Sequence, residues 1–250
     1  MKGLVAEFGD RTAEGIKPSE IEHWLSTRQD WAPATKNRYR ALMSLVFRQA
    51  MRNGKAKNNP ARLVAARTEN NGRIRYLLDE EERALRAVMR ERYPSHIPAL
   101  DVALNTGMRK GEQFSLTWDC VDLKRKQIAL DETKNGSSRH IPINSTCLEA
   151  FNLLAKSSHK KTDRIFRSTL GEPLNDPRQW FATAMDEANI AGFRWHDLRH
   201  TFCSRLVMAG VDIRTVAELA GHKTLAMAMR YAHLAPAHNL NAIEKLQRVE

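Results

Sequence analysis

The sequence predicts a mainly α-helical protein with one small antiparallel β-sheet, built as two domains. Apolar residues recur at helical spacing between capping residues through most of the 250-residue chain. Strand-like patterning is confined to residues 117–143, where two short runs flank a loop with the turn signal Asn135-Gly136. A polar stretch at 68–75 separates a strongly basic N-terminal part from the rest. We therefore expect a helical domain over residues 1–67, a linker over 68–75 and an α+β domain over 76–250.

Four helical segments are expected before the linker. The first, residues 4–9, is typical of the end of a helix whose beginning is missing. The second opens at Pro18, because the fixed φ of proline suits the first turn of a helix. The third is the longest, and we place its cap at Thr35 and its end at Asn53-Gly54. A last short helix is expected over 61–67.

The part after the linker combines helices with one hairpin. Asp79 and Glu82 form a capping-box variant at the start of its first helix. A more apolar helix over 98–105 is ended by Gly107, and another begins near Met108. The hairpin strands are placed at 127–130 and 139–143, and further helices at about 145–156, 176–189, 196–209, 212–220, 224–232 and 238–247.

The distribution of charge indicates a polyanionic partner. The net charge is +11, and residues 31–67 contain nine Lys or Arg but no Asp or Glu. Basic side chains follow one another at i,i+4 along the long helix, where like charges repel unless an anion neutralises them. A merely solvated basic surface is the alternative, but nucleic acid is the usual partner of such a face. The candidate DNA-contacting residues are Lys36, Arg38, Arg40, Arg48, Arg52 and Lys55.

Several classes of protein are disfavoured by composition. No apolar run approaches the roughly 18 residues of a membrane helix, and residues 1–10 lack the apolar core of a signal peptide. The chain has three cysteines, Cys120, Cys147 and Cys203, at wide spacing. This pattern favours reduced thiols in a cytoplasmic protein over a disulfide framework or a zinc site.

The segment 196–200 is the first candidate for chemistry. His196 and Arg199 are separated by three residues, so they share a helix face and can address one small anion. His196 and His200 have the spacing of zinc ligands, but the metalloprotease pattern requires Glu where this chain has Asp197. Ordinary surface histidines are also disfavoured, because flanking aromatic residues place the segment against a core, where charges need partners.

Four other residues remain ambiguous on spacing alone. Arg109 is either a structural partner of Glu112 or half of an anion clamp with a second arginine. Lys134, in the hairpin loop, is either a solvated lysine or a functional group. His222, at a corner between two helices, either caps a helix or donates a hydrogen bond to phosphate. Tyr231 is either a core residue or a nucleophile, and a phenol with an ordinary pKa of about 10 needs helpers to attack phosphate.

The order and separation of these motifs resemble the tyrosine recombinase (phage integrase) family over residues 76–235. Residues 18–67, with Asn59-Pro60, resemble the family's core-binding domain, whose first helix we expect to be truncated here. The motifs are Thr106-Gly107-Met108-Arg109-Lys110-Gly111-Glu112, Thr133-Lys134-Asn135-Gly136, His196-Asp197-Leu198-Arg199-His200, Leu219-Ala220-Gly221-His222 and Met229-Arg230-Tyr231-Ala232-His233-Leu234.

The resemblance implies a complete active site, supported by Glu112 and His200. Tyr231 would attack a DNA phosphodiester, with His196 as acceptor of its proton and Lys134 as acid for the leaving oxygen. The arginines and His222 would stabilise the charge of the phosphoryl group. The implied catalytic residues are Arg109, Lys134, His196, Arg199, His222 and Tyr231.

The implied activity is site-specific recombination of double-stranded DNA through a 3′-phosphotyrosine, with no metal, ATP or other cofactor. We expect a monomer or weak dimer without DNA, a homo-tetramer in the synaptic complex, and a cytoplasmic, nucleoid-associated protein. The tail 237–250 would dock on a neighbouring protomer or on its own domain. The alternatives are relaxation of DNA in the manner of a type IB topoisomerase and a non-catalytic DNA-binding regulator.

Overall fold

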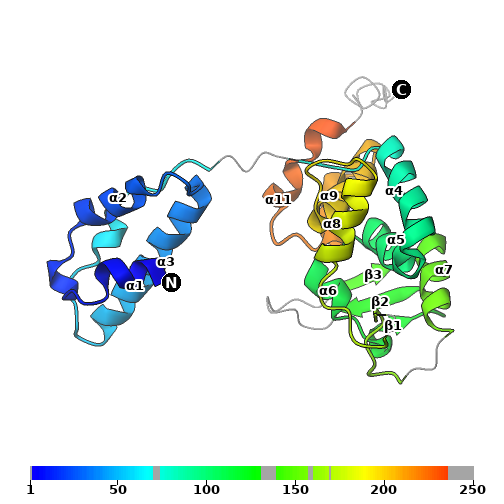
Figure 1. Ribbon diagram of the computed structural model, residues 1–250, viewed down its shortest axis with the longest axis horizontal. Helices are drawn as coiled ribbons and strands as arrows, with labels where there is room; N and C mark the ends of the chain where they lie inside the picture. The colour runs from blue at the N-terminus through cyan, green and yellow to red at the C-terminus, as the bar shows by residue number, and fades with distance from the viewer. Residues whose placement is uncertain (1, 70–73, 131–138, 157–159, 169, 236–250) are drawn as a thin grey trace, which may run out of the picture. The chain divides into compact units, whose positions relative to one another are not determined.

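The computed structural model describes residues 2–69, 74–130, 139–156, 160–168 and 170–235. The chain divides into two compact units, Met1–Arg73 and Ile74–Glu250, and the division falls inside the polar stretch 68–75 (Figure 1). We refer to them as the N-terminal and C-terminal units. Most of the described secondary structure is helical, and one three-stranded antiparallel sheet accompanies it. The predicted fold class is therefore confirmed.

The N-terminal unit is a small helical domain built around an aromatic cluster. Trp24, which is 3% exposed, packs edge-on against Trp31 and Tyr39, while the last two rings stack at 4.3 Å. Burial of large aromatic surfaces stabilises so small a unit. Its elements are α1 (Lys2–Phe8), η1 (Ala13–Gly15), α2 (Pro18–Thr27), α3 (Pro33–Arg52) and η2 (Pro60–Arg62).

Two expectations for this unit were wrong. The long helix α3 begins at Pro33 rather than after Thr35, because proline at the first helical position fixes a helical φ. The helix expected over 61–67 is only the single turn η2. Side chains of α3 bind this backbone instead: Arg40 Nε donates to the Val64 carbonyl, and Asn37 exchanges two 2.8 Å hydrogen bonds with the Arg67 backbone.

The C-terminal unit carries the sheet and the larger core. Strand β2 (Gln127–Leu130) pairs antiparallel with both β1 (Val121–Asp122) and β3 (Arg139–Pro142), and Ile128 lies opposite Ile141. Both isoleucines are almost fully buried, so one face of the hairpin packs on the core. The predicted hairpin pairing is confirmed, whereas β1 is an additional strand.

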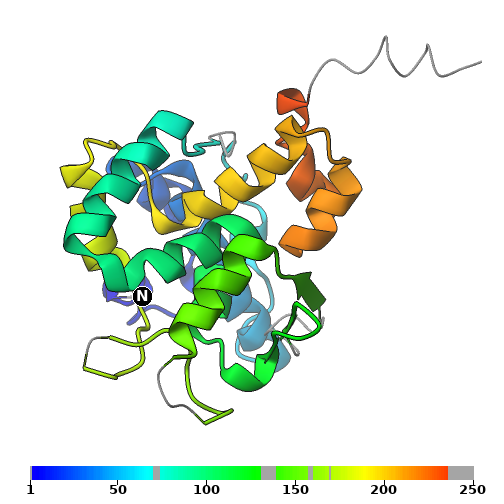
Figure 2. The ribbon, with the colours of Figure 1, turned by 90° about the vertical axis from the view of Figure 1, so that its right-hand side faces the viewer.

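Helices supply most of this core. The apolar helix α5 (Ile97–Thr106) lies between α7 (Ser145–Leu154) and α9 (Trp195–Met208), as Figure 2 shows. The remaining helical elements are α4 (Asp79–Arg92), η3 (Pro94–His96), α6 (Lys110–Phe114), η4 (Trp118–Cys120), α8 (Arg178–Glu187), α10 (Ile213–Ala220), α11 (Leu225–Met229) and η5 (Ala232–Leu234). No helix in the described ranges combines the length and apolar character that a membrane span requires.

The N-terminal cap of α4 differs from the one expected. Glu81, not Glu82, closes the capping box of α4 by accepting a 3.0 Å hydrogen bond from the Leu78 backbone. Glu82 instead forms ion pairs with Arg86 and Arg205. The segment predicted as a helix over 238–247 lies outside the described residues.

Candidate active site

Three arginines from distant segments bind carbonyl groups around the C-terminal end of α10. Arg109, at the start of α6, donates from Nη2 to the Gly221 carbonyl at 2.9 Å. Arg139 of β3 donates from Nη1 to Ala220 at 2.7 Å. Arg199 of α9 donates to the same Ala220 carbonyl. The last carbonyls of a helix lack intrahelical partners and form the negative end of its dipole, which explains why three cations gather there.

Glu112 fixes the orientation of two of these arginines. Its carboxylate accepts hydrogen bonds from the Arg109 backbone at 2.8 Å, from Arg109 Nη1 at 2.7 Å and from Arg139 Nη2 at 2.9 Å. Burial alone would raise the pKa of Glu112, but the Arg109 backbone bond and the charges of Arg139 and Arg109 lower it below the ordinary value. The carboxylate therefore stays ionised and holds both guanidinium groups in place.

Two glycines, at the ends of α5 and α10, allow neighbouring side chains to approach the backbone closely. Gly221 ends α10 with φ +65°, and a Cβ there would lie 1.4 Å from Arg139 Nη1. Gly107 ends α5 with φ +59°, and a Cβ there would lie 2.3 Å from the Phe202 ring. Both positions require left-handed backbone and the absence of a side chain. Gly107 also accepts a 2.7 Å hydrogen bond from Arg199 through its carbonyl, so the glycine positions the arginine.

Arg199 is a deeply buried cation. It is 4% exposed, and no carboxylate among the described residues forms an ion pair with it. Burial and the charge of Arg109 lower its pKa to about 10, so it is still positive at neutral pH. A buried charge that is only partly compensated is costly unless an anion joins it. The region around Arg199 is therefore a candidate anion-binding site.

Tyr231 lies beside this cluster, between α11 and η5. Its side chain is 1% exposed, and its hydroxyl lies 2.5 Å from Nδ1 of His200. Burial raises the pKa of Tyr231, and the neighbouring Cys203 raises it further, while Arg199 and Arg230 act in the opposite direction. The phenol is therefore protonated at neutral pH, and it requires a base before it can act as a nucleophile.

Three imidazoles surround the tyrosine and the arginines. The rings of His196 and His200 lie 5.2 Å apart, and the His222 ring lies parallel to Tyr231 at 6.3 Å. Burial lowers the pKa of His200 to about 4, with the charge of His196 as the next cause. Burial and then Arg199 lower the pKa of His222 to about 4. The pKa of His196 is lowered by the same two causes. The buried Nδ1 of His222 has no hydrogen-bond partner in the described part of the chain.

Comparison with known proteins identifies the family. The model of the phage integrase family matches residues 75–238, a range that contains every residue of this cluster. The chain belongs to the phage integrase family.

Curated relatives and solved structures agree with this membership. The chain is 32% identical over 207 residues to the shufflon-specific DNA recombinase of Escherichia coli, covering 81% of this chain and 52% of that protein. It is 30% identical over 219 residues to the integrase of Salmonella phage P22, covering 83% and 56%. It thus spans about half the length of these two relatives. The integrase of Haemophilus phage HP1 is 32% identical over 259 residues, covering 98% and 72%.

Two solved structures show the same fold. The Tn1549 transposon integrase in complex with a circular intermediate DNA superposes with a TM-score of 0.76 at 21% identity, covering 98% of this chain and 92% of that one. A lambda integrase (75–356) dimer bound to a COC′ core site superposes with a TM-score of 0.75 at 22% identity, covering 90% and 86%.

Seven of the eight active-site residues predicted from sequence lie together in this integrase-family chain. The eighth, Lys134, lies outside the described residues. Sequence reasoning missed Arg139, Arg230 and Cys203, which surround the same cluster. Arg230 directly precedes the tyrosine, so its position in the motif was a usable signal. Arg139 had no such signal, because the neighbouring sequence does not distinguish a strand arginine that points into the protein from one that points to solvent. The seven residues are Arg109, Glu112, His196, Arg199, His200, His222 and Tyr231.

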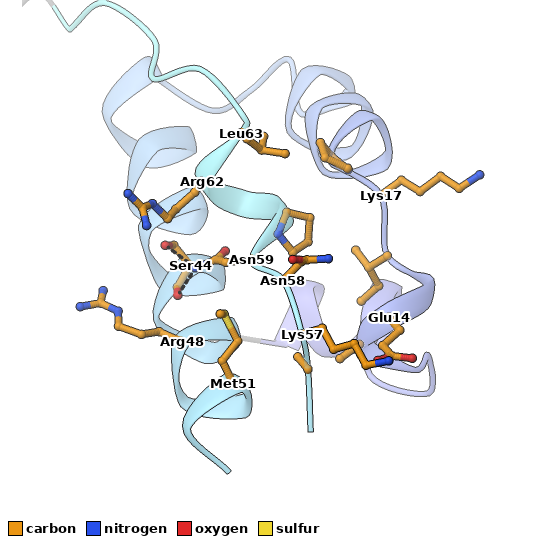
Figure 3. Close-up of a pocket in the computed structure, with 15 residues that line it drawn as sticks. Glu14, Lys17, Ser44, Arg48, Met51, Lys57, Asn58, Asn59, Arg62 and Leu63 are labelled. Carbon is orange, nitrogen blue, oxygen red and sulfur yellow. Dashed lines mark hydrogen bonds and ion pairs between the residues drawn. The ribbon is translucent and has the colours of Figure 1, made fainter. Parts of the chain in front are cut away.

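The basic helix of the N-terminal unit carries a second candidate surface. A groove lies between α3, the segment 56–63 and the segment that precedes α2 (Figure 3). Arg48 and Arg62 extend in the same direction on either side of Ser44, and both are exposed without an ion pair in the described residues. Asn59 fixes this wall by donating to the Ser44 carbonyl at 3.0 Å. Arg62 was not predicted from sequence.

Proposed function

We propose that this chain is a site-specific recombinase that cleaves and rejoins double-stranded DNA through a covalent bond between Tyr231 and a 3′ phosphate. The proposal is carried by Arg199, which is buried beside Arg109 and forms no ion pair within the described residues, and by a tyrosine that contacts an imidazole. A phosphodiester is an anion that fits two such guanidinium forks. The family membership of the chain supports the same chemistry.

The proposed reaction exchanges one phosphodiester for another. Tyr231 attacks the phosphorus, a bond from oxygen to phosphorus forms, and the bond to the 5′ oxygen breaks. A 5′-hydroxyl of a second strand then reverses the step, so bond energy is conserved and ATP is not required. We propose that Lys134 protonates the leaving 5′ oxygen. The groups proposed to face the phosphate are Arg and His, and the Glu112 carboxylate beside them is already bound to Arg109 and Arg139, whereas catalytic metal ions are held by carboxylates.

Arg109, Arg199 and His222 would stabilise the transition state. Charge grows on the phosphoryl oxygens as the tyrosine attacks, and preorganised donors are most effective there. His222 is neutral, and its Nδ1, which has no partner among the described residues, is a ring position available for a phosphate oxygen or for water. Glu112 and Arg139 keep Arg109 and the α10 carbonyls in place.

The N-terminal unit would contribute affinity for the DNA backbone. Arg48 and Arg62 are free to contact phosphates, and Lys36, Arg38, Arg52 and Lys55 remain candidates. Arg40 is bound to the Val64 carbonyl, so we assign it a structural role as well. We also propose that four copies assemble on two duplexes, with the tail 237–250 docking on a neighbour, and that the protein acts in the cytoplasm at the nucleoid. A solved lambda integrase tetramer is bound to a Holliday junction.

The test starts from DNA whose sequence is not assumed. The chain is incubated with a pool of nicked duplexes that carry a randomised 30-bp core, and DNA that remains attached to protein in SDS is recovered and sequenced. Two copies of the enriched sequence are then placed in one supercoiled plasmid. A recombinase converts the plasmid into two circles. Relaxation without resolution would support the topoisomerase alternative, and no covalent complex at all would support the non-catalytic regulator.

A further inference from the structure

Among the described residues, the Tyr231 hydroxyl has one basic hydrogen-bond partner, and it is not the one expected from sequence. Nδ1 of His200 lies 2.5 Å from the hydroxyl oxygen, with the two rings 5.8 Å apart. His196, the acceptor expected from sequence, lies one helical turn earlier on α9 and is more exposed than His200. Within the described residues, His196 makes no hydrogen bond to the tyrosine. The contact thus assigns the basic position to His200.

We propose that His200 is the catalytic base that removes the Tyr231 proton as the tyrosine attacks DNA, an inference that rests on the proposed function. In this step the proton moves from the phenolic oxygen to Nδ1 of His200, and the oxygen forms its bond to phosphorus. The 5′ oxygen leaves with a proton from the general acid. In the second step the attacking 5′-hydroxyl returns its proton to that acid, and His200 returns the first proton to Tyr231.

The alternative partner of the hydroxyl is a poor base. Cys203 is fully buried and also contacts the Tyr231 hydroxyl. Burial raises the pKa of Cys203, so it remains a thiol at neutral pH and is only a weak acceptor. A neutral imidazole with its proton on Nε2 presents a free lone pair at Nδ1, which is the atom that faces the hydroxyl.

The surroundings of His200 couple its basicity to the presence of the substrate. Burial, followed by interactions with His196, Arg230 and Arg199, lowers its pKa to about 4, while Asp197 acts in the opposite direction. His222 and Tyr231 also face it. A bound phosphate would offset the charge of Arg199 and favour the imidazolium. The tyrosine is therefore kept protonated without DNA and becomes activated when a phosphodiester occupies the arginine site.

The test uses a substrate whose leaving group does not need the general acid. The enriched duplex is synthesised with sulfur in place of the scissile 5′ oxygen, because a thiolate with a pKa near that of cysteine, about 8.5, leaves without protonation. Single-turnover formation of the covalent complex is then measured from pH 4 to pH 9 for the wild type and for His200→Asn, His196→Asn and His23→Asn. His23 is an exposed residue of α2 and serves as a matched control. Thermal unfolding of each variant is recorded in parallel.

The inference predicts a specific pattern. His200→Asn should react about 100-fold or more slowly at pH 7, the usual contribution of a general base. Its rate should keep rising with pH as hydroxide replaces the imidazole, whereas the wild-type rate reaches a plateau. His23→Asn should keep the wild-type rate and pH profile, and His196→Asn should keep the plateau whatever its absolute rate. Added imidazole should partly restore His200→Ala.

Three results would overturn the assignment. They are a wild-type rate in His200→Asn, a slow His200→Asn whose pH profile keeps the wild-type shape, and loss of the plateau in His196→Asn instead. If the wild type itself forms no covalent complex, the proposed function fails rather than the assignment of the base.

Discussion

The carboxylate of Glu112 and the guanidinium of Arg139 form a 2.9 Å ion pair that joins the start of α6 to β3. Their side chains are 10% and 14% exposed, so water screens the pair only weakly. The same carboxylate holds Arg109, and the same guanidinium holds the Ala220 carbonyl. Two residues 27 positions apart thus connect the arginine site to the end of α10.

Removing Arg139 should destabilise the C-terminal unit strongly. Arg139→Gln leaves Glu112 with less compensation and the Ala220 carbonyl with Arg199 as its remaining donor, and breaking a buried pair costs about 3–5 kcal/mol. The free energy of unfolding is measured by urea denaturation. The matched control is Arg125→Gln, because Arg125 is 84% exposed and forms only a 3.8 Å pair with Asp122. Its effect should stay within about 0.5 kcal/mol. Equal losses in both variants would show that the Glu112–Arg139 pair is not stabilising.

Gly221→Ala should reveal a steric conflict with Arg139. The new Cβ would lie 1.4 Å from Arg139 Nη1, and φ +65° adds backbone strain of about 1–2 kcal/mol. We expect the substitution to cost much less in an Arg139→Ala background, since only the strain then remains. The double-mutant cycle is measured by denaturation. Additive effects would mean that Gly221 is required for its φ alone.

The buried histidines should make stability depend on pH. Folding lowers the pKa of His200 and of His222 to about 4, compared with about 6.5 in an unfolded chain. Between these values the unfolded state binds more protons, so the free energy of unfolding falls as the pH drops from about 6.5 to about 4. His222→Asn should make this decrease shallower between pH 7 and pH 5, while the exposed His23→Asn should not. Parallel curves for His222→Asn and the wild type would contradict the buried, neutral state of His222.

The groove of the N-terminal unit should contribute to the salt dependence of DNA binding. Each phosphate contact contributes about 0.9 to the slope of log affinity against log salt. Arg48→Gln combined with Arg62→Gln should therefore reduce the slope by about 1.8. Arg40→Gln should mainly lower stability, because its Nε binds the Val64 carbonyl. An unchanged slope in the double variant would place the DNA-contacting surface elsewhere on the unit.

Much of the fold follows from local signals, because helix capping and the spacing of apolar residues depend on a few neighbouring positions. The hairpin at 127–130 and 139–142 is an example. The start of α3 was misplaced because Thr35 competes with Pro33, and proline fixes the backbone more strongly.

Long-range contacts explain what the sequence could not predict. Arg139 and Gly221 are 82 positions apart, and their contact exists only because β3 and α10 pack together. We expected His196 beside the tyrosine, and His200 lies there instead for the same reason. Both histidines lie on α9, and only the packing of α11 and η5 decides which of them meets Tyr231.

The central claim is that Tyr231 becomes covalently attached to DNA, and mass spectrometry of the trapped complex tests it most directly. The nicked duplex enriched from the random pool is incubated with the chain, the complex is digested with trypsin and nuclease, and the nucleotide-bearing peptide is sequenced. The account predicts a 3′-phosphoryl group on Tyr231 in the wild type and no adduct in Tyr231→Phe, which keeps the ring and loses the hydroxyl. An adduct on another residue, or one that persists in Tyr231→Phe, would contradict it.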